Sequence, residues 1–514
     1  IYSISGVWIY NVLGKKWRTD IAKIALGAST DMVQCVCQSS NGLVWIGRDQ
    51  NGICILDKQT KEYQILTHVE GDERSLQQNA IVSLYEDVNG IMWAGTYKKG
   101  VSYYNESTFK FGVSHVGDVN SVVEDVDGYL WIGTNDEGLV RWHKTKGIDK
   151  RYRSNTPNSI SADVIVAMKK ARDGKLWIGT FRGGVNCYDK GKFTHYRHIP
   201  GNPNSLVNDN IWSLDEDKEG NIWIGTLGGG VQCLNPKTGK FDTYNMTNGL
   251  ISDYIASVQV SKDNQLLVAT SYGMSIIDLE SRQIANFHGP KSGNLEFSEQ
   301  NLNQIYQDSR GLLWIATRSG VNIYDLRTDK LVVLTEEDGL SSQVITGITE
   351  DDNKNIWLAT AKGLTNVIPS VDAKSSDYSF RFYTYSDLDG LQNCEFNMRS
   401  LSKLSNGELV VGGMYGVNYF HPDNIKYNKI LPKVIFTGLS LFNEEVKVGK
   451  EYDNKVILET NLNAQREIEL KYKQNVFSID FASDNFVLPE KMKYAYKLDG
   501  FSTDWLTTNV GKVT

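Results

Sequence analysis

The stretch KEGNIWIGTLGGGVQCLNPKTGKFDTYN, residues 218–245, alternates short apolar runs with turn residues. Its run IWIGT, residues 222–226, is too short for a helix and is bounded by turn residues, so it predicts a strand buried on both faces. The GGG that follows at residues 228–230 predicts a tight hairpin turn, because glycine readily takes positive φ values. Further strands are expected at residues 211–214, 231–234 and 241–244. Together these four antiparallel strands would form one small sheet.

The central motif of this stretch recurs along most of the chain. Neighbouring copies lie 38 to 53 residues apart, and their central positions are Trp45, Trp93, Trp131, Trp177, Trp223, Leu267, Trp314, Trp357 and Val410. A sheet-forming repeat of this period is typical of a β-propeller, in which each blade is one four-stranded sheet. A strand that is apolar on both faces fits this fold, because each blade is packed between two others.

Nine motifs exceed the four to eight blades of a usual propeller, so the sequence predicts more than one ring. The shortest spacing, between Trp93 and Trp131, indicates the seam. We expect a complete seven-bladed propeller at residues 113–428, preceded at residues 1–112 by blades of an incomplete N-terminal propeller. The segment FKF at residues 109–111 could instead supply the outer strand of the final blade and close the second ring. A single ring of nine or ten blades is the alternative geometry.

The repeat stops after Pro422. Strands with alternating polar and apolar residues are expected at residues 434–436, 467–470, 476–481 and 494–498. Antiparallel strands with polar connections predict an immunoglobulin-like β-sandwich at residues 429–514. The segment is short for a full sandwich, so we expect it to be truncated. The predicted fold class is therefore all-β, with a seven-bladed β-propeller, part of a preceding propeller and a C-terminal sandwich.

Composition excludes several classes of function. The net charge of −7 argues against a nucleic-acid-binding surface, because phosphate binding needs clustered lysine and arginine. No run of 18 apolar residues is present, so nothing in the chain is expected to span a membrane. The six cysteines include no CxxC spacing and are interpreted as occasional buried thiols rather than a disulfide framework or a metal site.

The sequence offers no pattern that favours catalysis. Acidic pairs recur at the same turn of several blades, which favours structural turn chemistry over the paired carboxylates of a glycosidase; they are Glu86-Asp87, Glu124-Asp125, Asp215-Glu216-Asp217 and Glu350-Asp351. The start of a calcium loop at Asp215 lacks its closing glutamate, because Thr226 occupies that position. The seven histidines show no zinc spacing, and nucleotide-binding and nucleophile motifs are missing. We expect no catalytic residues, no metal and no cofactor.

Propeller geometry indicates where a ligand could bind. The loops between the second and third strands of each blade open on the same face as the inter-blade loops, and this face is the more variable one. Sugar recognition requires aromatic platforms beside planar hydrogen-bonding side chains, with Arg or Lys for a carboxylate or sulfate. The candidate ligand-binding residues on these loops are Arg182, Tyr272, Arg318, Lys362 and Tyr415. The three basic residues hint at an acidic sugar.

The repeated phrase ED-x-x-G-x-(L/I)-W-I-G-T-x-x-GG resembles the two-component-regulator propeller repeat, most closely around Trp131, Trp177 and Trp223. The later phrase YAYKLDGF at residues 494–501, followed by Trp505, is similar to the triple-tyrosine domain that follows such propellers. The pair, in this order, covers nearly the whole chain. The resemblance is therefore to the periplasmic sensor region of Bacteroidetes hybrid two-component systems.

This resemblance implies a periplasmic region of an inner-membrane receptor that binds an oligosaccharide from a dietary or host glycan. It implies that the intact receptor is a homodimer and that it contacts the membrane only through a downstream helix. A histidine kinase would follow this helix, and the receptor would control polysaccharide-utilisation genes. No nucleic acid is expected to bind this region itself. Two alternatives stay open: a propeller-fold enzyme that degrades polysaccharide, and a protein-interaction scaffold.

Overall fold

The computed structural model describes residues 2–3, 6–7, 9–11, 14–18, 32–70, 75–108, 110–292, 295–371, 378–392, 395–427, 432–465, 467–487 and 491–513. The chain divides into two compact units, one formed by residues 109–426 and the other by residues 1–108 together with 427–514. The further division into three domains at residues 112 and 428 stays a prediction. No helix among the described residues has the length and apolar character needed to cross a membrane.

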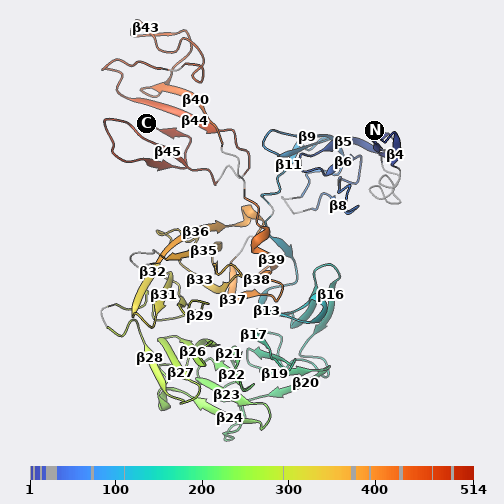
Figure 1. Ribbon diagram of the computed structural model, residues 1–514, viewed down its shortest axis with the longest axis vertical. Helices are drawn as coiled ribbons and strands as arrows, with labels where there is room; N and C mark the ends of the chain where they lie inside the picture. Colours follow the sequence, from blue (N-terminus) through green and yellow to red (C-terminus); the bar gives the residue numbers. More distant parts are fainter. Residues whose placement is uncertain are drawn as a thin grey trace. The chain divides into compact units, whose positions relative to one another are not determined.

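Residues 109–426 form a seven-bladed β-propeller, with its blades arranged around a central axis (Figure 1). Each blade is a four-stranded antiparallel sheet in which chain order equals spatial order, except in the seventh. The first four blades are β13 (Val119–Glu124), β14 (Tyr129–Thr134), β15 (Leu139–His143), β16 (Gly147–Tyr152); β17 (Ile165–Lys170), β18 (Leu176–Thr180), β19 (Gly184–Asp189), β20 (Lys192–Tyr196); β21 (Ile211–Glu216), β22 (Ile222–Thr226), β23 (Val231–Asn235), β24 (Lys240–Tyr244); and β25 (Ile255–Val260), β26 (Gln265–Thr270), β27 (Gly273–Asp278), β28 (Ile284–Phe287).

The remaining blades follow the same plan. They are β29 (Gln304–Gln307), β30 (Leu313–Ala316), β31 (Val321–Asp325), β32 (Lys330–Leu334); β33 (Ile345–Glu350), β34 (Ile356–Thr360), β35 (Gly363–Val371), β36 (Tyr378–Tyr385); and β37 (Phe396–Lys403), β38 (Leu409–Gly413), β39 (Gly416–Phe420) with β12 (Gly112–Ser114). Short 3-10 turns lie at Val126–Gly128, Met246–Asn248, Asp387–Asp389 and Pro422–Asn424.

The motif strands are buried on both faces, as predicted. Every residue of β18, β22, β30 and β34 is buried, and the indole rings of Trp223, Trp314 and Trp357 are fully inaccessible. Leu267 and Val410 occupy the same core position in blades without the tryptophan. Each of these strands therefore packs against the sheet on either side.

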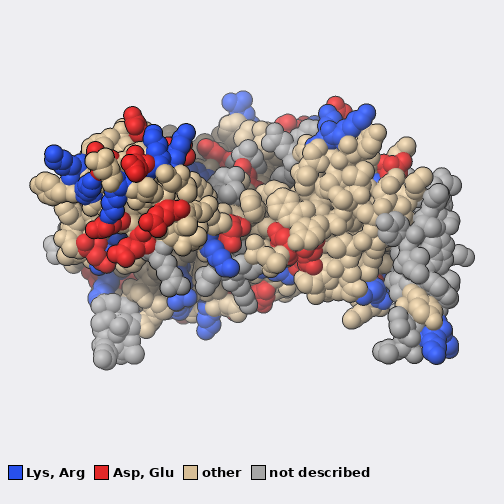
Figure 2. Space-filling view, turned by 90° about the horizontal axis from the view of Figure 1, so that it is seen from above, with Lys and Arg blue, Asp and Glu red and all other residues tan. Residues whose placement is uncertain are grey.

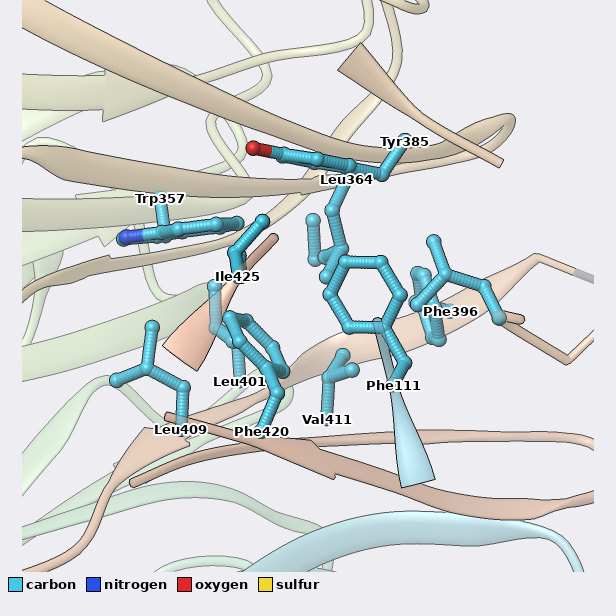
Figure 3. Close-up of a cluster of buried hydrophobic side chains, with 12 residues drawn as sticks. Phe111, Trp357, Leu364, Tyr385, Phe396, Leu401, Leu409, Val411, Phe420 and Ile425 are labelled. Atoms are coloured by element: carbon cyan, nitrogen blue, oxygen red, sulfur yellow. The ribbon is translucent and has the colours of Figure 1, made fainter. Parts of the chain in front are cut away.

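Strand β12 closes the ring by pairing with β39 of the seventh blade. The predicted closing segment at residues 109–111 is thus displaced by a few residues, and Phe109 lies outside the described residues. Phe111 instead buries its ring against Tyr385 and Phe420, at centroid distances of 5.3 and 4.7 Å (Figure 3). Lys110 forms an ion pair of 2.7 Å with buried Asp389.

The first and seventh blades are also bonded directly. Strand β13 packs against β37 and β38, and Ser405 donates its backbone N–H and its hydroxyl to Glu124 at 2.8 and 2.6 Å. Ser309 bonds Glu350 of the next blade in the same way, at 2.9 and 2.6 Å. The alternative of one ring of nine or ten blades is wrong, because seven blades already complete the circle.

The N-terminal segment contains further blades of the same type. Strands β5 to β8 form a four-stranded sheet and β9 to β11 a three-stranded one: β5 (Val33–Gln38), β6 (Val44–Arg48), β7 (Ile53–Leu56), β8 (Tyr63–Leu66), β9 (Ile81–Glu86), β10 (Met92–Thr96) and β11 (Val101–Tyr104). Two short hairpins precede them, β1 (Tyr2–Ser3) with β2 (Gly6–Val7) and β3 (Ile9–Asn11) with β4 (Lys16–Arg18). The five described cysteines are unbonded thiols, as expected; they are Cys35, Cys37, Cys54, Cys187 and Cys233.

The C-terminal segment is also all β. Its main sheet has the order β41-β40-β44-β47, with two hairpins beside it; the strands are β40 (Val434–Leu441), β41 (Glu444–Glu445), β42 (Glu451–Tyr452), β43 (Lys455–Val456), β44 (Phe477–Ser483), β45 (Tyr494–Tyr496), β46 (Leu506–Thr508) and β47 (Lys512–Val513). The strand expected at residues 467–470 is not formed. Ile468 and Leu470 instead pack, outside any ladder, on the apolar cluster around Leu439.

Candidate functional site

Most of the innermost strands of the propeller have a bulge near their first residue. The pairing of β13, β17, β21, β25 and β33 with the next strand shifts at the second residue, which leaves one residue unpaired in each; these residues are Asn120, Val166, Trp212, Ala256 and Thr346. A bulge at a sheet rim re-aims the side chain that it carries. Three of these residues, Asn120, Val166 and Trp212, line a cavity at the mouth of the central channel.

This cavity, called here the mouth pocket, has a volume of about 350 Å³. It is lined by Asn120, Asn135, Val164, Val166, Phe181, Trp212, Asn397, Met398 and Arg399. The lining includes second-to-third-strand loops (Asn135, Phe181), so the pocket opens on the face predicted for ligand binding. A channel cavity of about 310 Å³ lies among the inner strands of all seven blades and shares Val166 and Arg399 with the mouth pocket.

Strand β37 contributes a wider bulge than the other inner strands. Phe396 pairs with Gly413, but the next pair is Leu401 with Val411, so residues 397–400 stand opposite a single residue. The side chain of Asn397 donates to Asp118 and to the carbonyl of Val119, at 2.6 and 2.9 Å. Ser400 donates its hydroxyl to the carbonyl of Gly412 at 2.7 Å. The bulge is therefore held firmly against the first blade.

Arg399 stands at the centre of this bulge with φ +60°, a left-handed conformation that non-glycine residues seldom adopt. Its Nη1 donates to the carbonyl of Ala256 in the fourth blade, and its Cζ lies 5.7 Å from the centre of the Trp212 ring. Burial lowers the pKa of Arg399 to about 10, which leaves the guanidinium charged at neutral pH. No described carboxylate lies within ion-pair distance of this guanidinium.

The opposite wall of the mouth pocket is aromatic. Phe181 and Trp212 meet edge to face with centroids 6.4 Å apart, and Arg182 lies over Phe181 at 5.1 Å. Asn120 and Asn135 provide amide groups beside these rings. Apolar ring faces next to amides and a cation are what a sugar ring with polar substituents requires.

The five candidate residues from the sequence are all exposed on second-to-third-strand loops, and none lines the mouth pocket. Arg182 contacts its wall through Phe181. Tyr272 packs edge-on against His288 at 4.9 Å, and Lys362 lies 3.5 Å from Glu336. Arg318 donates its backbone N–H to Glu299, and Tyr415 donates its own to Gln392. Their role in binding stays a prediction.

Trp212 and Arg399 line the mouth pocket but are not among the five candidate residues from the sequence. Both lie in strands that the sequence presents as ordinary inner strands, and only the bulges turn them toward the channel mouth. One signal for Arg399 is visible in the sequence. The spacing from Trp357 to Val410 is the longest in the chain, which leaves room for extra residues before the last motif strand.

The acidic pairs are structural, as predicted. Asp217, nearly fully buried, accepts the backbone N–H groups of Glu219 and Asn221 and the indole N–H of Trp223, the last at 2.9 Å. Equivalent aspartate–indole bonds occur in other blades, namely Asp87–Trp93, Asp308–Trp314 and Asp351–Trp357. Within the described ranges, no group of three or more His, Cys, Asp or Glu side chains is arranged to hold a metal ion.

A larger cavity of about 580 Å³ lies on the opposite face, between the hairpins of the second and third blades. Its charged residues are largely engaged: Arg172 bonds Glu216 and the carbonyl of Asp217, and Lys175 bonds Asp173 at 2.6 Å. Acidic and basic residues also stand side by side on the face of the molecule seen in Figure 2. The mouth pocket is the stronger candidate, because its cation has no such partner among the residues that the structure describes.

Fold and cavity together define a β-propeller with a lined pocket at its channel mouth. The chain carries two-component regulator propeller repeats: residues 75–98, 115–136, 205–228, 296–319 and 339–362 match the model of that family. It is 30% identical over 191 residues to histidine kinase P4 of Formosa agariphila, a match that covers 37% of this chain and 13% of that protein. The sequence-based recognition of these repeats is confirmed.

Solved structures share the fold. The extracellular domain of a hybrid two-component system from B. thetaiotaomicron is 24% identical, with a TM-score of 0.77 over 100% of this chain and 66% of that chain. A second such domain from the same organism is 22% identical, with a TM-score of 0.51 over 100% of this chain and 67% of the other. The chain thus spans about two thirds of these domains and a small part of the kinase.

Proposed function

We propose that this chain is the ligand-sensing part of the periplasmic region of a hybrid two-component system, and that it binds an oligosaccharide at the mouth pocket. The observation that carries the proposal is the juxtaposition of Phe181 and Trp212 with two asparagine amides and the cation of Arg399. The propeller repeats and the shared fold with extracellular domains of such systems support the sensor role.

The exposed loop residues Arg182, Tyr272, Arg318, Lys362 and Tyr415 are proposed as flanking contacts for the ends of a longer oligosaccharide. They lie on the same face as the mouth pocket, and two of them offer aromatic rings more than half exposed. No catalytic step is assigned to this chain.

Signalling would follow from differential binding. A ligand shifts the arrangement of a receptor only by as much as it prefers one arrangement over the other. We propose that the intact receptor is a homodimer whose C-terminal β segment passes this shift to a membrane helix and a kinase outside the chain, and so controls polysaccharide-utilisation genes.

Titration calorimetry of the chain against a panel of glycan-derived oligosaccharides tests the proposal. We expect one class to bind, and Trp212→Ala to weaken that binding about tenfold or more, because truncating an aromatic residue at the centre of a binding site commonly costs about 2 kcal/mol. Ile148→Ala, which removes an exposed apolar side chain from the outer strand β16, is the control and should change the affinity little.

Two results would contradict this function. Absence of binding to every oligosaccharide class would remove the sensor proposal. Sustained turnover of a polysaccharide, abolished by one carboxylate substitution, would favour the propeller enzyme instead.

A further inference from the structure

Arg399 lies where the mouth pocket and the channel cavity meet, since it lines both. One of its nitrogens donates to the carbonyl of Ala256, and a guanidinium has five N–H donors. Other partly buried arginines of the propeller have carboxylate partners: Arg141 bonds Asp125 and Asp149, and Arg310 bonds Asp308. Among the described residues, Arg399 has none, so most of its donors are free for a ligand.

The charge of Arg399 is not balanced elsewhere in the two cavities. Their lining contains one other cation, Lys169, which forms an ion pair of 2.6 Å with Asp215. Tyr306 stays neutral at physiological pH, because burial raises the pKa of its hydroxyl to about 12. The described lining therefore carries one net positive charge, on the partly buried guanidinium of Arg399. A partly buried charge without a counter-ion can gain from a ligand that carries the opposite charge, which is a reason to look for a partner outside the chain.

The backbone fixes Arg399 in place before any ligand arrives. Its left-handed φ is a strained conformation, and such strain persists where surrounding contacts over-determine it, most often at functional sites. Those contacts are present: Asn397 is bonded to the first blade, and Ser400 to the carbonyls of Asn397 and Gly412. A cation held in this way needs little reorganisation to bind an anion.

We propose that Arg399 recognises an anionic substituent, a carboxylate or a sulfate, on the oligosaccharide bound at the mouth pocket, and so sets the sensor's preference for acidic glycans. The inference rests on the proposed function and adds the class of ligand. A guanidinium matches either anion through two parallel N–H bonds. The sugar ring would pack on Trp212 while the anion points into the channel toward Arg399.

The test compares matched pairs of ligands by titration calorimetry on the whole chain. One pair is a uronic-acid oligosaccharide and its carboxyl-reduced form; the other is a sulfated oligosaccharide and its desulfated form. We expect the acidic member of at least one pair to bind about tenfold tighter than its neutral counterpart, as charge-assisted hydrogen bonds allow. The pair that shows the preference distinguishes carboxylate from sulfate.

Variants assign the preference to one side chain. Arg399→Gln should abolish the difference within the pair, because it removes the charge that favours the acidic member. Arg399→Lys, which keeps the charge but cannot form two parallel N–H bonds, should retain only part of the difference. Arg172→Gln, on the opposite face, removes one positive charge and should leave the preference intact. Thermal unfolding checks that each variant is folded. Should Arg399→Gln fail to fold, the inference is tested by the preference for the acidic member in the unaltered chain and in Arg399→Lys.

The outcomes are distinguishable. Equal affinity for acidic and neutral members, or a preference that survives in folded Arg399→Gln, would overturn this inference and leave the oligosaccharide sensor standing. Absence of binding to every oligosaccharide would overturn the proposed function itself, and the inference with it.

Discussion

At the scale of single residues, the repeated aspartate supplies an acceptor for the buried indole N–H of several motif tryptophans. An indole N–H in a core needs an acceptor, and Asp217 supplies one to Trp223 while it also closes the hairpin through backbone bonds. The sequence predicts this structural role from the recurrence of the acidic pair at one turn. Because the Asp217 carboxylate already accepts these N–H bonds, it needs no cation as a further partner.

The blade of Trp131 shows where such prediction fails. Asp125 stands six residues before this tryptophan, as Asp217 does before Trp223, yet its carboxylate bonds Arg141 and Lys170. The Trp131 indole N–H has no partner among the described residues. Burial by itself would raise the pKa of Asp125, but these bonds outweigh it and hold the pKa below its usual range. Asp125 can bond Arg141 instead of the indole because Arg141 lies opposite Trp131 in the sheet. Only the pairing register of the folded sheet reveals this neighbour.

Removing Asp217 should therefore lower the stability of the protein rather than its affinity for a ligand. We predict that Asp217→Ala lowers the free energy of unfolding by about 2–4 kcal/mol, because it leaves the indole and backbone donors unsatisfied inside the blade. Urea unfolding followed by tryptophan fluorescence measures this. Lys218→Ala, at the exposed neighbouring position, should change the stability by less than about 0.5 kcal/mol. Equal effects of the two substitutions would contradict the structural role of Asp217.

At the scale of elements, the ring is closed by a strand from before the first blade. The sequence predicts this possibility but places it at residues 109–111, whereas the ladder begins at Gly112. The reason is packing: Phe111 is drawn into the apolar cluster of the sixth and seventh blades, and Lys110 into an ion pair with Asp389 (Figure 3). These residues anchor the strand, so the pairing starts one residue beyond them.

This anchor gives a second stability prediction. Phe111→Ala should lower the free energy of unfolding of the propeller by about 3–5 kcal/mol, the usual range for a large buried aromatic residue cut to alanine. Differential scanning calorimetry would show it as a lower transition temperature. Met246→Ala, an exposed residue of the same unit, should leave the transition unchanged. A transition that is insensitive to Phe111 would mean that closure by β12 does not stabilise the ring.

The wide bulge of β37 is an element that sequence reasoning misses. In residues 396–403 the apolar residues Phe396 and Met398 alternate, but Leu401 is out of phase with them, and the register shift lies between Phe396 and Leu401. Bulges are set by how two strands pair, and pairing is a property of the folded sheet. In the sequence, the extra residues are recorded by the long spacing before Val410 and by the change of phase between Met398 and Leu401.

At the scale of the whole molecule, the repeat predicts the propeller and the face on which loops gather, and the structure confirms both. The candidate site is predicted only in part. Phe181 follows a motif strand directly and can be placed on the loop face from sequence, whereas Trp212 and Arg399 come from blades far apart in the chain. Their meeting depends on ring closure, which brings the third and seventh blades to one axis.

The most direct measurement is a crystal structure of the chain with a bound oligosaccharide from the panel. We predict a sugar ring packed on Trp212 in the mouth pocket, with an anionic substituent within hydrogen-bond distance of Arg399. An oligosaccharide bound on the hairpin face, or on the outer loops with the mouth pocket empty, would contradict the account.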